Sequence, residues 1–274
     1  MGAYNYDHAT THQESRPANH SFGRDRPRLE QEQSALRMYS YLPWELRHHI
    51  HTFCVQGSYD NEVVVRHSTG SKLALLVRQS IGTQSYQWAE DPILLQLGPD
   101  RIGMNAAREV LDTYYRTRTF KFVHEELGLL RSFLETDSFG LAIRPADHVR
   151  RLHLQIRPFK YTQLREPKWK DDEETRCLKA LESLAGLQVP CTTVDIHIDL
   201  AQDFSDDEEY EELLDHAAGF VFRVMRLVDT LRMNGLKLEL SFEGRWDGRD
   251  GTKLCSSSVS SIDDCITKMK IACQ

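Results

Sequence analysis

The sequence predicts an α/β fold in which irregular strand–helix repeats form a largely parallel sheet with helices on one face, preceded by a helix and a small β-hairpin. Two observations predict it: from residue 99 onward, apolar stripes of helical period alternate with short β-type segments, and those segments are apolar at every second position only. Strand–helix–strand alternation implies parallel strands that are joined by right-handed crossovers.

The first hundred residues are expected to hold a tail, a helix and a hairpin. Residues 1–35 carry almost no aliphatic side chains, which predicts a disordered tail. A helix at 36–56 is followed by the strand Glu62–His67, which a four-residue loop joins to a second strand, Leu73–Val77. Residues 79–92 show no clear period and are interpreted as a loop within the hairpin region 60–98.

Residues 36–274 are interpreted as one domain, with the strand–helix alternation at 99–245 and a Ser-rich loop and C-terminal helix at 246–274. The predicted strands are 119–124, 149–157, 193–200 and 236–243. The helical stripes between them run over 107–114, 127–134, 178–185 and 213–231. Ser205 with Glu208 forms a capping box for the last helix, and Asn234-Gly235 supplies its end.

The last three strands predict a sheet with one polar face. In Arg151–Arg157, the apolar residues alternate with polar ones, and the two following strands repeat the pattern. A doubly wound sheet is apolar on both sides, so we expect the helices on one face only. The spacing of the strands is longer than in leucine-rich repeats, which favours an irregular layer. The open face would carry Arg151, His153, Gln155, Asp195, His197, Asp199 and Glu239.

Three interpretations of this polar face stay open. Cross-strand ion pairs on a solvated face are favoured over a surface that binds a partner or ligand. A catalytic or metal site is least favoured, although His153 and Glu239 are expected beside His197, and histidines flanked by carboxylates suit acid–base chemistry or metals. No motif supports a catalytic residue, a metal ligand or a cofactor.

The segment Leu42–Cys54 is the one place where spacing suggests a partner. Pro43 suits the first turn of a helix, on which Leu46, Ile50, Phe53 and Cys54 then form an apolar stripe. This stripe would contact a partner or, as the favoured alternative, the domain's own core.

Histidines on the same helix give a weaker signal. His48 and His51, with Cys54 a turn further, have a spacing that could hold a metal. Since no second pair of ligands is visible, ordinary surface or boundary histidines are favoured.

Composition narrows the class of protein. The chain of 274 residues has a net charge of −7 and a pI near 5.9, which disfavours nucleic acid as a partner. It shows no signal peptide and no apolar run long enough to span a membrane, and its six cysteines lack a CxxC pair. We therefore expect an intracellular protein, cytoplasmic or nuclear, with reduced thiols.

Three stretches carry a family resemblance: Leu42-Pro-Trp-Glu-Leu-Arg47, then residues 107–122, and then residues 130–156. Together they resemble a group of uncharacterised fungal proteins that begin with an F-box-like LPxE(L/I)R helix. The resemblance implies a non-enzymatic protein-interaction module, in which Leu42, Pro43, Leu46 and Ile50 contact an adaptor subunit of a ubiquitin ligase. The alternative is an enzyme or a small-molecule-binding protein that uses the polar sheet face.

Overall fold

The computed structural model describes residues 41–56, 61–68, 73–81, 85–157, 167–187, 192–199, 210–244 and 252–254. The strands are β1 (Glu62–His67), β2 (Leu73–Ile81), β3 (Ser85–Glu90), β4 (Thr119–Phe122), β5 (Arg151–Ile156), β6 (Thr193–Asp199), β7 (Lys237–Gly244) and β8 (Thr252–Leu254). The longer helices are α2 (Trp44–Gln56), α5 (Met104–Thr117), α8 (Pro167–Glu182) and α9 (Tyr210–Met233). Shorter helical segments are α3 (Pro92–Gln96), α4 (Pro99–Ile102), η1 (His124–Leu129), α6 (Leu130–Glu135), α7 (Pro145–His148) and η3 (Ser183–Gly186).

The described strands form one mixed sheet, in the order β3-β2-β1-β4-β5-β6-β7-β8. The central strands β1, β4, β5, β6 and β7 pair in parallel, and their order in the sheet is the same as their order along the chain. Antiparallel strands flank them at both ends, namely the β2–β3 hairpin extension and β8. This arrangement confirms the predicted α/β class with a largely parallel sheet.

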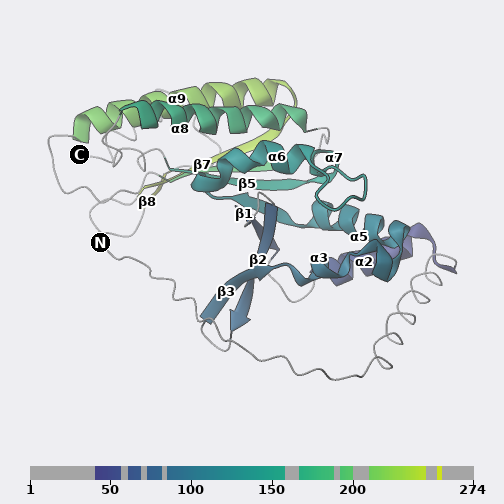
Figure 1. Cartoon of the computed structure of the whole chain (residues 1–274). Helices are drawn as coiled ribbons and strands as arrows, with labels where there is room; N and C mark the ends of the chain where they lie inside the picture. Colours follow the sequence, from purple (N-terminus) through teal and green to yellow (C-terminus); the bar gives the residue numbers. More distant parts are fainter. Residues whose placement is uncertain are drawn as a thin grey trace.

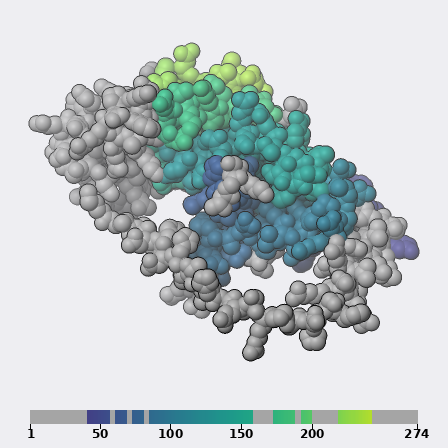
Figure 2. Space-filling model, in the orientation of Figure 1, coloured from purple at the N-terminus to yellow at the C-terminus, as the bar shows by residue number. Residues whose placement is uncertain are grey.

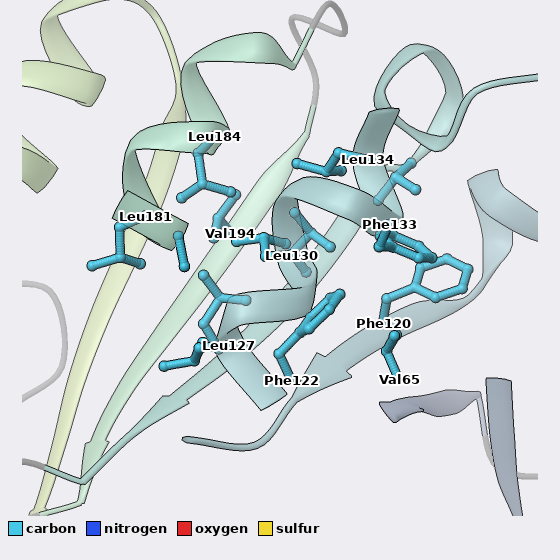
Figure 3. Close-up of a cluster of buried hydrophobic side chains, with 14 of the residues drawn as sticks. Val65, Phe120, Phe122, Leu127, Leu130, Phe133, Leu134, Leu181, Leu184 and Val194 are labelled. Carbon is cyan, nitrogen blue, oxygen red and sulfur yellow. The ribbon is translucent and has the colours of Figure 1, made fainter. Parts of the chain in front are cut away.

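The helices cover one face of this sheet. Figure 1 shows α6, α8 and α9 on the same side of the strands, and Figure 2 shows α8 and α9 forming part of the outer surface there. Inward-facing residues of the central strands, such as Val63, Phe120, Leu152 and Val194, belong to one buried cluster with residues from these helices. Part of this cluster is drawn in Figure 3. The helices therefore lie on one face, as the alternating strands predicted.

Aromatic side chains fill the part of the core beneath α5 and α6. Phe120 is fully buried, and its ring lies 5.0 Å from the ring of Phe133 and 5.6 Å from the ring of Tyr115, between centroids. Tilted and edge-on aromatic pairs at such distances contribute beyond the area that they bury. The aromatic cluster thus fixes α5 and α6 against β4.

Some local predictions were wrong. Residues 85–90 form the strand β3 where a loop was expected. The loop was predicted because the segment has no alternating aliphatic residues, and in the structure most of its side chains are exposed. The strand predicted at 119–124 ends at Phe122, and His124 begins a 3-10 helix. Residues 252–254 form β8 within the segment interpreted as a loop.

One further prediction was confirmed, and three others concern residues that the structure does not describe. α9 ends where expected, since Gly235 has a φ of 92°, a left-handed conformation that glycine adopts without strain. The predicted tail at 1–35, the Ser205 cap and the C-terminal helix lie outside the described residues.

Candidate functional site

Helix α2 packs on the domain through the side that carries Arg47, His51 and Val55. It lies beside α5 (Figure 1), and Arg47 makes a two-pronged contact with Glu109 of α5, with Nε–Oε2 and Nη2–Oε1 distances of 3.1 and 2.9 Å. Arg47 also donates a hydrogen bond to the carbonyl of Leu42 at 2.8 Å, and this bond fixes the residues just before the helix against its first turn. His51 and Val55, one and two turns further along, are the buried residues of α2.

The apolar stripe of α2 is therefore exposed. Leu46 is 49% exposed, Ile50 41% and Phe53 82%, and Cys54 is exposed as well. The favoured interpretation that this stripe faces the domain's own core was wrong. The helical period predicts that the apolar residues share one side of the helix, but it does not show which side is buried. Here the charged contacts of Arg47 hold the opposite side against the domain, so the apolar side faces outward.

The exposed apolar surface continues at the start of α2. Trp44 is 62% exposed and Tyr41 81% exposed, whereas Pro43 ends the connection before the helix and its carbonyl accepts the hydrogen bond from the Arg47 amide. Scattered apolar residues on a surface are ordinary, whereas apolar residues gathered on one exposed side are typical of interaction sites, so this side of α2 is a candidate.

The histidines of α2 contact α5. His51 Nε2 lies 3.3 Å from a carboxylate oxygen of Glu109, and His48 Nδ1 lies 3.4 Å from the hydroxyl of Thr113. Burial lowers the pKa of His51 below its ordinary value of 6.5, against the opposing effect of Glu109. The described residues contain no group of three or more metal-ligating side chains, so His48, His51 and Cys54 do not form such a group.

Acidification is expected to weaken the packing of α2. Because the folded state lowers the pKa of His51, the unfolded state binds more protons, so this contribution to stability is complete above pH 6.5 and is lost as pH falls from there through the folded-state pKa. The variant His51→Gln should lose less stability than the wild type between pH 7.5 and 5.5, as measured by urea unfolding. His49→Gln, at an exposed position of the same helix, should behave as the wild type. Equal losses in His51→Gln and the wild type would contradict this assignment.

The predicted polar side chains do lie together on the open face of the sheet. Leu152, Leu154 and Ile156 are buried, whereas Arg151, His153 and Gln155 between them are not, and β6 repeats the alternation with Asp195, His197 and Asp199. In β7, Glu239 is exposed between the buried Leu238 and Leu240.

The register of the strands differs from the expected one. His153 pairs with Asp195, which pairs with Glu239, whereas His197 pairs with Gln155 and Ser241. His153 is therefore a diagonal neighbour of His197, with 6.3 Å between ring centroids, and Glu239 was wrongly expected beside it. The alternation of a strand fixes its face but not its offset against the next strand.

Many charged side chains of this face pair with one another. Glu62 of β1 lies 3.1 Å from Lys121 Nζ and 3.7 Å from His153 Nδ1, and the contact with His153 is the largest cause that lowers the pKa of Glu62. Arg157 contacts Asp199 at 3.1 Å, as the cross-strand interpretation predicted. A cavity of about 800 Å³ opens elsewhere, between η1, α6 and α8, where Arg131, Arg176 and Lys179 are among its lining residues.

A further group of exposed residues, which was not predicted from the sequence, lies at the hairpin end of the open face. Arg78 lies on β2 with its guanidinium 3.7 Å from the ring centre of Tyr86 on β3, and Trp88 of β3 pairs with Arg78 in the register. Tyr86 is 57% exposed and Trp88 45% exposed. The alternation of two aromatics at positions 86 and 88 was the available signal, since aromatic residues are enriched in strands.

The fold defines the class to which this chain belongs, an α/β protein with a mostly parallel, one-sided sheet. Comparison with family models, with curated proteins and with solved structures finds no match. Within the described part of the chain, no helix has the length and apolar character needed to cross a membrane.

Proposed function

We propose that this chain is a non-enzymatic protein-interaction module that presents helix α2 to a helical adaptor subunit of a ubiquitin ligase and uses the open sheet face to engage a client. The observation that carries the proposal is the exposed apolar stripe Leu46, Ile50 and Phe53 on a helix whose opposite side, with His51 and Val55, is buried.

The spacing of the stripe supports a groove-type contact. Anchors at i, i+4 and i+7 are typical of an amphipathic helix that lays its apolar face into a groove of a partner. Burying a side chain of this size contributes roughly 1.5–3 kcal/mol, so three partly exposed anchors can supply much of the affinity of a micromolar complex.

Arg47 gives the LPxE(L/I)R-like start of this helix a structural role. Its side chain bonds to the carbonyl of Leu42 within the motif and to Glu109 outside it, and both contacts orient the helix. With Arg47 directed inward, Leu46 and Ile50 are held outward. The resemblance to F-box-like helices is thus consistent with a helix that is anchored by the side that carries Arg47 and binds by its apolar side.

The alternative, an enzyme or small-molecule-binding protein that uses the polar sheet face, gains less support. Enzymatic acid–base groups converge in a concave site within hydrogen-bond reach of one reacting atom. Here His153 contacts Glu62 and His197 contacts Ser241, and the 800 Å³ cavity is lined by residues of η1, α6, α8 and η3. We expect the module to act inside the cell, in the cytoplasm or the nucleus.

A direct binding measurement tests the adaptor contact. Full-length wild type and the variant Leu46→Asp/Ile50→Asp are titrated with a purified fungal adaptor subunit by isothermal titration calorimetry. We expect the double variant to bind at least about tenfold more weakly, because two charges replace two apolar anchors.

The matched control is Met233→Asp at the end of α9, which also places an acid at an exposed apolar position, 85% exposed. It should bind as the wild type does. Folding of each variant is checked by its thermal unfolding. No binding by folded wild type, or equal binding by the double variant, would refute the adaptor role of α2.

A further inference from the structure

The edge of the sheet at β3 has the features of a site for an added strand. β3 is the last strand at its end of the described sheet, and its side chains are exposed or half-buried throughout. Proteins usually protect such an edge against pairing with a further strand by means of lysine, proline or a β-bulge. The sequence Ser85–Glu90 has neither lysine nor proline, and its register with β2 is continuous.

The backbone polarity of β3 is set by its pairing with β2. The amide of Asp91 donates to the carbonyl of Leu75 at 3.1 Å, so this pair is hydrogen-bonded. In an antiparallel ladder the hydrogen-bonded pairs alternate with pairs whose backbone groups point away. Tyr86, Trp88 and Glu90 therefore direct their N–H and C=O groups outward, where an extended segment could pair with them.

The side chains beside this edge favour an acidic segment. Arg78, which pairs with Trp88 in the register, is exposed on the open face and has no carboxylate within ion-pair distance among the described residues. Arg78 reaches over Tyr86 toward the edge, and the exposed ring of Trp88 next to it can cover an apolar side chain. Glu90 lies at the end of β3, and its charge disfavours an acidic side chain of the bound segment next to it.

We propose that β3 binds an extended acidic peptide by strand addition, with an acidic side chain of the peptide on Arg78 and an apolar one on Trp88. This inference rests on the proposed client-binding role of the sheet face and is independent of the adaptor contact of α2. Single-stranded nucleic acid could also use arginine and aromatic side chains. The outward N–H and C=O groups of β3 can pair with the backbone of a peptide, whereas a sugar-phosphate chain offers no matching ladder, and this favours the peptide.

The test uses the full-length chain and fluorescein-labelled peptides of ten residues in a fluorescence anisotropy titration. We expect a peptide that alternates Glu and Val to bind, and one that alternates Lys and Val to bind at least about tenfold more weakly. A Glu/Val peptide that is N-methylated at alternate amides, on the edge that pairs with β3, should lose binding. Equal binding of the Lys/Val or the N-methylated peptide would overturn the proposal, as would no binding of the Glu/Val peptide.

Three substitutions locate the site. Arg78→Gln and Trp88→Ala should each weaken the Glu/Val peptide by about fivefold or more, whereas Glu90→Gln should strengthen it about twofold by removing a repulsion. Arg226→Gln, at an exposed position on α9, is the matched control and should change nothing. Leu46→Asp/Ile50→Asp should also keep peptide binding, so that failure of the adaptor contact and failure of this proposal can be told apart.

Hydrogen exchange gives a readout that does not depend on substitutions. The amides of Tyr86 and Trp88 should become protected when the Glu/Val peptide is added, because strand addition occupies their outward N–H groups. Binding without this protection would overturn strand addition. Tighter binding of a ten-residue oligouridine than of the Glu/Val peptide would overturn the proposal and identify nucleic acid as the ligand. A dimer of the free chain that is dissociated by Trp88→Ala would also overturn it and identify a second copy of the chain as the partner of β3.

Discussion

Replacement of Asp91 by asparagine is expected to lower the free energy of unfolding by about 3–5 kcal/mol, the cost of breaking a buried charge pair. Asp91 and Arg118 are both fully buried, and a carboxylate oxygen of Asp91 lies 3.6 Å from Arg118 Nη2. The same carboxylate accepts hydrogen bonds from the Tyr114 hydroxyl at 3.1 Å and from the Ile93 amide at 3.0 Å. The substitution keeps the shape of the side chain but leaves the charge of Arg118 without its carboxylate.

Equilibrium urea unfolding measures this effect. Asp229→Asn, at a position where the side chain is 61% exposed and contacts Arg232, should change stability by less than about 1 kcal/mol. The double variant Asp91→Asn/Arg118→Met should recover part of the loss, because it removes the uncompensated charge. A loss below about 1 kcal/mol in Asp91→Asn would show that the pair is not buried as described.

Truncation of Phe120 to alanine is expected to cost about 3–5 kcal/mol as well, because it removes an aromatic ring from the packed core and leaves a cavity. Phe120 is fully buried, and its ring contacts the rings of Tyr114, Tyr115 and Phe133. The loss should appear as a lower urea midpoint with little change in the slope of the transition.

Phe53→Ala on α2 is the matched control, since it removes the same ring from a position that is 82% exposed. We expect it to change stability by no more than about 0.5 kcal/mol. A large loss in Phe53→Ala would mean that the apolar stripe of α2 is buried in the folded chain, and the proposed adaptor surface would then fail with it.

The parallel core could be predicted from the sequence because its pattern is local. In β5 and β6, every second residue is apolar and becomes buried, and the helix stripes between them have an equally clear period. The two strands of the β1–β2 hairpin were predicted for the same reason, whereas their register, from Val63–Val77 to His67–Leu73, and the extension of β2 to Ile81 were not. Each of the predicted features depends on neighbouring residues in the chain.

The candidate binding surfaces could not be predicted from the sequence, because they depend on contacts between residues that are far apart in the chain. The outward direction of Leu46 and Ile50 follows from the pairing of Arg47 with Glu109, which are far apart in the sequence. The strand β3 has no apolar face of its own, so its existence depends on pairing with β2. The offset between β5 and β6, which separates His153 from His197, is likewise a property of the assembled sheet.

The order of the parallel strands affects how the sheet can assemble while the chain is being synthesised. From β1 through β4, β5 and β6 to β7, each of these described strands leaves the ribosome after the strand with which it pairs in parallel, which then lies at the growing edge. The antiparallel strands β1, β2 and β3 are complete before any of these crossovers begins, and β2 occupies the other side of β1. A nascent chain can therefore build this sheet in one direction, without opening an earlier strand pair to insert a later one.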